Sequence, residues 1–196
     1  MIIRIFDIVF ALIGLIVLGP FLILLSIWIS LDSSGGPFFK QKRVGKNGVE
    51  FQLYKFRSMR PLSESAGQLT VGMKDPRITR VGALLRKFKL DELPQLINVL
   101  KGDMSLVGPR PEVPKYVALY SESQRAVLNV RPGVTDEASL KYFDENRLLA
   151  LSDNPEETYI NEVMPNKLAL NMAFVNDPSL SKYLMTIYRT VKKIIE

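Results

Sequence analysis

An uncharged apolar run near the N-terminus constrains this chain more than any other feature. No charged side chain occurs between Ile8 and Leu31. At roughly 1.5 Å of helical rise per residue, this run of about 24 residues is long enough to cross the ~30 Å hydrocarbon core of a bilayer. It is too long for a cleaved signal peptide, and no small-residue cleavage site leads into a polar mature start. We therefore predict a membrane segment.

The residues themselves leave open the path of this segment through the membrane. Gly19 and Pro20 lie near its middle and interrupt the helical hydrogen-bond ladder. Because proline is tolerated in spanning helices, a kinked spanning helix is favoured over a re-entrant hairpin. Arg4 on one flank and the basic stretch Lys40 to Arg43 on the other both carry charge typical of the cytoplasmic side, which argues for the hairpin.

The remaining composition restricts both chemistry and partners. The chain of 196 residues has no histidine and no cysteine, which excludes zinc sites, thiol nucleophiles and disulfides. Covalent or acid-base chemistry then falls on carboxylates, lysines or hydroxyls, and a metal would be bound by oxygen, as magnesium is. The net charge of +6 indicates an anionic partner, which is nucleic acid, a lipid headgroup or a phosphorylated metabolite.

The pattern predicts a mostly helical α+β fold in two parts, a membrane segment with its hinge over residues 1–36 and a small cytosolic domain over residues 37–196. Alternation and an Asn-Gly turn predict a short β-hairpin formed by residues 38–44 and 50–56. Residues 63–76 are polar and contain glycine, as in a surface loop that could close over a substrate.

Helical periodicity accounts for most of the remainder. Thr79 is placed to cap one helix, and a second helix follows with a glycine as its stop. Pro94 fits only in the first turn of that second helix, which places Asp91 close to its N-cap. A final apolar stripe over residues 180–195 is interpreted as core packing, with membrane docking as the alternative. Two further helices are predicted, over residues 112–130 and 136–151.

The adjacent acids Asp91 and Glu92 are the leading candidates for chemistry. An acid at a helix N-cap also has a purely structural explanation, since it satisfies free backbone N–H groups and suits the helix dipole. The same environment would keep Asp91 ionised, and hence a competent nucleophile or metal ligand, and a helix N-terminus also attracts phosphate. Structural and catalytic roles are therefore compatible at this position.

Cations in the sequence suggest a phosphate site beside these acids. Arg110 lies between Pro109 and Pro111, whose fixed φ angles stiffen the turn and present the guanidinium to an anion. Lys55 and Arg57 leave the second strand on the same side, a spacing suited to a diphosphate. Each signal has an ordinary alternative, a rigid turn in the first case and solvated strand cations in the second.

Four blocks of the sequence together resemble a known family. In chain order, the blocks are Tyr54–Met59, Leu90–Ser105, Val107–Glu112 and Val130–Thr135. They resemble the bacterial sugar transferases called monotopic phosphoglycosyl transferases. The resemblance runs from the membrane segment to about residue 135, and its central blocks are too long to arise by chance.

This resemblance implies transfer of a sugar-1-phosphate from a UDP-sugar to polyprenyl (undecaprenyl) phosphate at the cytoplasmic face of the bacterial inner membrane, with Mg²⁺. It implies that Asp91 attacks the sugar-bearing phosphate and releases UMP, and that the lipid phosphate then attacks the phosphosugar-enzyme. Glu92 would help the metal or the incoming lipid phosphate, so that both acids are expected metal ligands. The residues expected to hold nucleotide or phosphate are Lys55, Arg57, Arg86, Pro109, Arg110 and Pro111.

The resemblance also implies a monotopic protein, whose apolar segment is a re-entrant hairpin broken at Pro20 and surrounded by inner-membrane phospholipid. No nucleic-acid partner is expected, and a homodimer is left open. Beyond Thr135 the chain departs from the family pattern. Residues 135–141 replace the sequence with which many members continue, and Asn171 stands where the family has an aspartate. The donor sugar and the glycoconjugate pathway are therefore not predicted.

A non-catalytic alternative is a membrane-anchored basic protein that binds nucleic acid or anionic lipid. It would explain the positive charge and the apolar anchor. It leaves the adjacent acids Asp91 and Glu92 among cations unexplained, and the aromatic-basic interleaving expected of a single-strand platform is thin. Substitution of Asp91 separates the two hypotheses, because only the non-catalytic protein would tolerate it.

Overall fold

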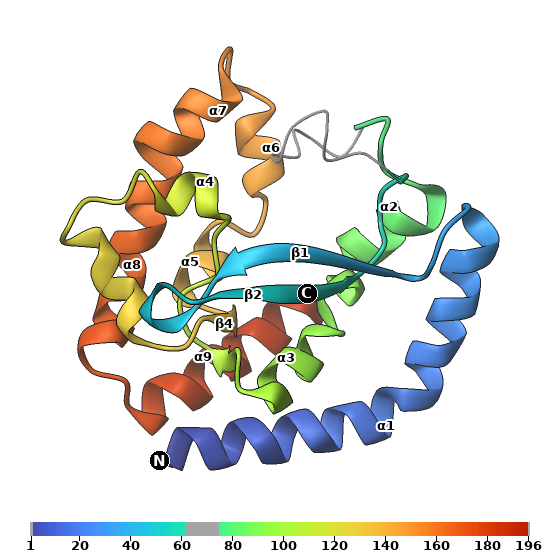
Figure 1. Ribbon diagram of the computed structural model, residues 1–196, viewed down its shortest axis with the longest axis horizontal. Coiled ribbons are helices and arrows are strands. Elements are labelled where there is room, and N and C mark those ends of the chain that lie inside the picture. Colours follow the sequence, from blue (N-terminus) through green and yellow to red (C-terminus); the bar gives the residue numbers. More distant parts are fainter. Residues whose placement is uncertain (1, 62–74, 196) are drawn as a thin grey trace.

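The computed structural model describes residues 2–61 and 75–195, so nearly all of the predicted loop over residues 63–76 lies outside the described part. Helices predominate, and a small β-hairpin lies at the centre of the fold (Figure 1). The N-terminal helix α1, Ile2–Asp32, runs along one side of the globular body and then turns up beside it. The mostly helical α+β fold with a long apolar N-terminal helix is thus confirmed.

Helix α1 is continuous over 31 residues and contains Pro20. Figure 1 shows a bend between its two halves, which the proline explains because it lacks an N–H and its ring displaces a preceding carbonyl. Of the described helices, α1 is the one long and apolar enough to cross a membrane. Its surface away from the body is apolar along both halves. The buried positions of α1 are Asp7, Ala11, Leu25 and Ile29.

The predicted β-hairpin is confirmed. Strands β1, Phe38–Val44, and β2, Glu50–Phe56, pair antiparallel along their whole length. The turn η1, Lys46–Gly48, holds Asn47 and Gly48 at positive φ, a region that asparagine and glycine tolerate best. The hairpin brings the chain from the end of α1 into the globular body.

The segment that carries the two candidate acids is built from short helical pieces. Helix α2, Arg80–Lys87, begins as predicted, because Oγ1 of Thr79 accepts a 2.9 Å hydrogen bond from the N–H of Gly82. A single 3₁₀ turn, η3, Leu90–Glu92, then precedes helix α3, Gln95–Lys101. The predicted glycine stop of α3 is confirmed, since its C-cap is a glycine at φ 92°.

The position predicted for Asp91 is wrong. The N-cap of α3 is Pro94, and Asp91 lies one turn earlier, inside η3. Lys89 adopts a left-handed conformation with φ 55°, which reverses the chain after α2 and leaves room for only one tight turn before the proline. The backbone N–H groups of α3 are therefore not capped by the Asp91 carboxylate.

A second small sheet, which the sequence did not predict, joins distant parts of the chain. Strand β3, Ser105–Val107, pairs in parallel with β4, Gly133–Thr135. The backbones approach closely beside this pair, where a Cβ at Gly108 would lie 2.4 Å from the carbonyl oxygen of Arg131. Only glycine fits there, so the turn that follows at residues 109–111 is held tightly against β4.

The predicted helix over residues 112–130 is wrong. The segment folds as a short helix α4, Pro114–Val117, and a 3₁₀ segment η4, Gln124–Asn129, joined by turns. Between them, the side chain of Gln124 accepts a hydrogen bond from the N–H of Ser121, whose own hydroxyl accepts one from the N–H of Gln124. These local side-chain bonds take the place of helical ones.

The C-terminal third is helical with interruptions. The helix predicted over residues 136–151 is broken near Tyr142, so that it forms two short helices. The main apolar core lies between α8, η5, η4 and α4, where buried side chains such as Tyr116 and Tyr159 meet. The elements of this part are α5 Glu137–Lys141, α6 Glu145–Leu149, α7 Pro155–Thr158, the π-helical η5 Tyr159–Val163, α8 Met164–Asn176 and α9 Leu180–Ile195.

Helix α9 occupies its predicted range, but the interpretation of its apolar stripe as core packing is wrong. The side chains that α9 buries are Tyr183 and Thr186, on an adjacent face. Tyr183 donates a 2.9 Å hydrogen bond to the carboxylate of Asp7, which ties α9 to α1. The exposed apolar residues of the stripe are Leu184, Tyr188, Val191 and Ile195.

Candidate active site

A cavity of about 1730 Å³ opens between α2, η3, β4 and the segment from α5 to α6. Five of the residues that the sequence singled out line it together. The three cations come from strand β2, helix α2 and the turn after β3, and the two acids come from η3. Cations from three elements therefore surround the acids of η3. These five residues are Lys55, Arg86, Asp91, Glu92 and Arg110.

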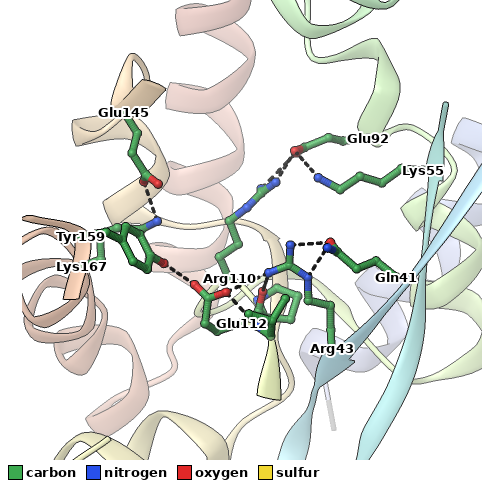
Figure 2. A network of polar contacts seen from close by, with 11 residues as sticks. Gln41, Arg43, Lys55, Glu92, Arg110, Glu112, Glu145, Tyr159 and Lys167 are labelled. Atoms are coloured by element: carbon green, nitrogen blue, oxygen red, sulfur yellow. Dashed lines mark hydrogen bonds and ion pairs between the residues drawn. The ribbon is translucent and has the colours of Figure 1, made fainter. Parts of the chain in front are cut away.

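Glu92 is held by two cations at once (Figure 2). Nη1 of Arg110 donates to Oε2 at 3.0 Å, and Nη2 of Arg110 donates to Oε1. Nζ of Lys55 donates to the same Oε1 at 3.2 Å. Burial alone would raise the pKa of Glu92, but the charges of Arg110 and Lys55 outweigh burial and hold this pKa well below its ordinary value. Glu92 is therefore a fixed anion that sets the positions of both cations.

Asp91 differs from Glu92 in the pairing and in the pKa of its carboxyl group. Its side chain is buried, yet within the described residues its carboxylate accepts no hydrogen bond and forms no ion pair. Burial raises the pKa of Asp91, the charge of Glu92 raises it further, and the more distant charges of Lys55 and Arg86 oppose the rise. The N-cap environment predicted to keep Asp91 ionised is absent. Asp91 is instead a buried, unpaired acid that lines the cavity, and its raised pKa shows that the fold alone does not stabilise its charged form.

Further cations surround these acids. Nε of Arg86 donates to Oγ of Ser58 at 3.0 Å, which fixes the guanidinium against the end of β2. Lys89 enters the cavity from its left-handed position, with Nζ 4.9 Å from the ring centre of Phe143 on the opposite wall. Burial lowers the pKa of Lys55 despite the charge of Glu92. The cavity thus has a dense positive lining beside one unpaired carboxylate.

Arg57 is not brought to this cavity. Its guanidinium donates to the carbonyl oxygens of Ser33 and Ser34, both at 2.7 Å, and to that of Ile29 at 3.3 Å. These are acceptors at and just beyond the C-terminal end of α1, where cations are favoured by the helix dipole. In this structure Arg57 fastens α1 to strand β2, and its predicted contact with phosphate stays a prediction.

Pro109 and Pro111 flank Arg110 without lining the large cavity. Both line a smaller cavity of about 170 Å³ on the other side of the turn. The carbonyl oxygen of Pro109 accepts a 3.0 Å bond from the N–H of Gly133, and that of Pro111 accepts a 3.1 Å bond from Arg43. The two prolines therefore support the turn that aims Arg110, and a direct contact with nucleotide stays a prediction.

Two features of the site were missed by the sequence reasoning. The first is the C-terminal end of α9, where Lys193 and Ile194 line the cavity. The second is a polar network behind Arg110, in which Glu112 accepts from Arg43 at 3.0 Å and from the hydroxyl of Tyr159 (Figure 2). Glu112 follows the Pro-Arg-Pro turn directly, and this adjacency was the only signal in the sequence for its role.

The donor chemistry at Asp91 and Glu92 fits a hard cation, but only in part. Within residues 2–61 and 75–195, no group of three or more acidic side chains gathers to hold a metal ion. Both oxygens of Glu92 are already engaged by Arg110 and Lys55. Asp91 is thus the one of the two acids with oxygens available. Mg²⁺ commonly takes one or two carboxylates and completes its shell with water and substrate phosphate, which this arrangement allows.

Comparison with known proteins identifies the family to which the chain belongs. The sequence matches the bacterial sugar transferase family over residues 1–196. It is 34% identical to the UDP-glucose:undecaprenyl-phosphate glucose-1-phosphate transferase of Caulobacter vibrioides, over 98% of this chain and 69% of that protein. It is 34% identical to the UDP-N-acetylgalactosamine-undecaprenyl-phosphate N-acetylgalactosaminephosphotransferase of Aeromonas hydrophila, over 96% of this chain and 42% of that protein.

A shorter match of higher identity is found with the exopolysaccharide production protein PSS of Rhizobium leguminosarum bv. phaseoli, 54% over 55% of this chain and 54% of that protein. The chain therefore spans about half the length of some of its relatives and more than two thirds of others. With the family matched over its full length, the chain belongs to the bacterial sugar transferases. The resemblance drawn from the four sequence blocks is confirmed at the level of the family.

Proposed function

We propose that this protein transfers a sugar-1-phosphate from a UDP-sugar to undecaprenyl phosphate, as the first membrane step in the synthesis of a glycoconjugate. The observation that carries the proposal is the unpaired, buried carboxylate of Asp91 in a cavity lined by Lys55, Arg86, Lys89 and Arg110. The names of the relatives from Caulobacter and Aeromonas describe this reaction with different sugars, which supports the reaction class and leaves the donor sugar open.

The arrangement supports a two-step mechanism. In the first step, an Oδ atom of Asp91 forms a bond to the sugar-bearing phosphorus, while the bond from that phosphorus to the bridging oxygen breaks and UMP leaves with the electron pair. In the second step, an oxygen of the lipid phosphate attacks the same phosphorus and Asp91 leaves as a carboxylate. One small site then serves a soluble donor and a lipid acceptor in turn.

The cations make attack by an anion on an anion feasible. Arg110 and Lys55, both held by Glu92, lie beside Asp91 and present positive charge to the diphosphate before any substrate is bound. Such preorganised charge stabilises the transition state because no reorganisation is needed during the reaction. Glu92 accordingly acts by positioning, and the raised pKa of Asp91 falls once a bound cation or substrate replaces its missing solvation.

Mg²⁺ completes the proposed site. Asp91 and the phosphate oxygens of the donor would hold it, and Glu92 would join only by exchanging Arg110 or Lys55 for the metal. When bound, Mg²⁺ would neutralise charge on the diphosphate and on the leaving UMP.

We also propose that α1 enters and leaves the membrane by one leaflet. Near its start, Nη1 of Arg4 donates to the carbonyl of Val99 at 2.7 Å and Nη2 donates to that of Leu100 at 3.1 Å. Near its end, Asp32 accepts a 3.1 Å bond from the N–H of Val81, and Arg57 holds the last carbonyls. Both ends of α1 are thus bonded to one globular body, which supports a path that returns to the same membrane face.

The same geometry supports the cytoplasmic face of the bacterial inner membrane as the location, with phospholipid around α1. Arg4 near the start of α1 and the basic stretch Lys40 to Arg43 beyond its end carry charge of the type found on the cytoplasmic side. The exposed apolar stripe of α9 adds a second surface for the bilayer. The division into a membrane segment over residues 1–36 and a catalytic domain over residues 37–196, and assembly as a homodimer, stay predictions.

The test is a donor panel in detergent or nanodiscs. Wild-type protein is incubated with Mg²⁺, undecaprenyl phosphate and, in separate reactions, UDP-glucose, UDP-galactose and UDP-N-acetylgalactosamine, while UMP and lipid-linked sugar are measured. One donor should release UMP and give product in equal amounts. In the absence of lipid, up to one UMP per enzyme should appear with a matching mass increase of the protein. UMP release that depends strictly on lipid, with no adduct, would replace the two-step mechanism by direct transfer.

A further inference from the structure

Two buried polar side chains from distant parts of the chain, Asp136 and Asn171, are in direct contact in the fold. Asp136 belongs to the altered stretch after Thr135, and Asn171 stands 35 residues later in α8. Nδ2 of Asn171 donates to Oδ2 of Asp136 at 2.6 Å, and both side chains are buried. Because an amide and a carboxylate are bonded to each other in a buried place, the two side chains form one local arrangement.

Asp136 is a buried carboxylate that three donors stabilise. The N–H of Arg110 donates to Oδ2 at 2.9 Å, and the N–H of Ser139 donates to Oδ1 at 2.5 Å. The amide of Asn171 provides the third bond, and no salt bridge to Asp136 is present in the described part of the chain. A carboxylate that is 3% exposed requires such donors, because burial without them would cost several kcal/mol.

These bonds link α8 to the candidate catalytic acids. Asp136 fixes the backbone of Arg110, the Arg110 side chain grips both oxygens of Glu92, and Glu92 adjoins Asp91. Pro109 and Pro111 restrict the φ angles on either side of Arg110, and their carbonyl oxygens are bonded to Gly133 and Arg43. The bond from the N–H of Arg110 to Asp136 fixes the residue between them. Burial lowers the pKa of Arg110, but the charge of Glu92 and, more weakly, that of Asp136 raise it above its ordinary value.

We infer that Asp136 and Asn171 form a positioning pair for Arg110, in which the acid must stand at 136 and the amide at 171. An aspartate at 171 would place two carboxylates in contact in a buried place. An asparagine at 136 would offer one oxygen where Arg110 and Ser139 use two. The inference rests on the proposed function, since the task of the pair is to aim Arg110 at the reacting diphosphate.

A double-mutant cycle tests whether Asp136 acts through Arg110. UMP release is measured for the wild type, Asp136→Asn, Arg110→Lys and the double variant, with the donor that the panel identifies. We expect Asp136→Asn to lower kcat about tenfold, as the loss of a buried hydrogen bond to a charged group does. In the Arg110→Lys background the same change should lower kcat less than threefold, because the group being positioned is already altered. Equal fold losses in both backgrounds would overturn the inference.

The exchange of partners is a second test with its own expectation. Asp136→Asn combined with Asn171→Asp keeps one acid and one amide in contact. It should not restore kcat, because the acid then lies on α8, away from the backbone N–H groups of Arg110 and Ser139 that it has to accept from. Recovery to wild-type kcat in the exchanged variant would show that the pair only needs one acid in either place and would refute the assignment.

A stability measurement tests the pair without relying on activity. Asn171→Asp should unfold at a lower temperature than wild type. The difference in unfolding temperature should grow between about pH 4 and pH 8, because contact with Asp136 raises the pKa of the new carboxyl in the fold. Asn166→Asp, at an exposed site on the same helix, is the matched control and should show no such growth. A pH-independent deficit would contradict the contact. Other charged side chains line the same small cavity, and they are unchanged in both variants, so the comparison isolates residue 171. They are Arg43, Arg110, Glu112, Glu145 and Lys167.

The two kinds of failure are distinguishable. If the wild type releases no UMP with any donor, the proposed function fails, while the stability comparison still decides whether the pair exists. If the wild type is active and Asp136→Asn keeps its kcat and KM while losing only thermal stability, the function stands and the positioning role falls.

Discussion

Arg110 grips both carboxylate oxygens of Glu92 from a turn 18 residues further along the chain. A bidentate arginine fixes the orientation of its partner as well as its charge. Both oxygens of Glu92 are thereby engaged, whereas the carboxylate of the adjacent Asp91 is unpaired within the described residues. In the proposed mechanism the two acids therefore have different roles, Glu92 as the partner of the cations and Asp91 as the nucleophile.

This division predicts opposite effects of two conservative substitutions. Asp91→Asn should abolish turnover, because an amide is not a nucleophile, and should raise thermal stability at neutral pH. The sign follows from the raised pKa of Asp91. A carboxyl whose pKa is higher in the fold than in the unfolded chain lowers the free energy of unfolding as pH rises above the ordinary pKa near 4. UMP release and thermal unfolding of the same preparation measure both effects. Turnover by Asp91→Asn above one hundredth of wild type would rule out the nucleophile.

Glu92→Gln is the contrasting variant. It should impair turnover severely and destabilise the protein by about 2 to 3 kcal/mol at neutral pH, because it leaves Arg110 and Lys55 buried without their anion. The pKa of Glu92 is lowered in the fold, so its contribution is present above about pH 4.5 and is lost as pH falls below that value. The stability gap between variant and wild type should accordingly close in acid. A gap that stays constant with pH would contradict the ion pair.

Chelation should abolish turnover without unfolding the protein. The site lacks histidine, and its free oxygens are hard ligands suited to magnesium. Calcium should support the reaction poorly because it accepts looser geometry. UMP release is measured in excess chelator and after readdition of each ion, with thermal unfolding as the control. Full activity in chelator would remove the metal from the mechanism.

Lys89 should be strained by its left-handed backbone. With φ 55° in a residue that has a Cβ, replacement by glycine relieves roughly 1 kcal/mol, so Lys89→Gly should be more stable than wild type. Lys87→Gly is the matched control, since it removes a neighbouring lysine from helical backbone and should lose about 1 kcal/mol. Activity of Lys89→Gly should fall, because the cavity loses a cation. Denaturant unfolding gives the change in free energy of unfolding for each variant. Changes of the same sign in both variants would contradict strain at Lys89.

The topology of α1 can be tested by labelling, since the chain has no cysteine of its own. Single cysteines at Ile2 and Lys46 flank the apolar helix on either side. A membrane-impermeant thiol reagent should label both in inverted inner-membrane vesicles and neither in intact right-side-out vesicles. Labelling of the two sites from opposite faces would restore a spanning helix.

Local signals in the sequence were sufficient for several elements. Thr79 has one plausible role as a cap, and Asn47 with Gly48 selects a hairpin turn regardless of what packs around it. Lys55, Asp91, Glu92 and Arg110 lie in the sequence blocks that carry the family resemblance, and the structure places them with Arg86 around one cavity. Such features depend on a few neighbouring residues, which is why they could be predicted.

Tertiary contacts decided the rest. Arg57 has the same sequence signature as Lys55, and only the position of the end of α1 shows that it binds backbone carbonyls. The parallel pairing of β3 with β4 joins segments 28 residues apart in register, which no local pattern encodes. The pair Asp136 and Asn171 looked like two separate departures from a family pattern until the fold placed them in contact.

The fastening of α1 at both ends has a consequence for how the protein responds to its membrane. A spanning helix adjusts its tilt to the thickness of the hydrocarbon layer. In the proposed single-leaflet arrangement, the bonds of Arg4 and Arg57 would instead set the depth of the helix from within the protein. The height of Asp91 above the lipid surface is then a constant of the fold. Acyl-chain length should matter little to such a protein, whereas lateral packing in the one leaflet that its helix must displace should matter a great deal.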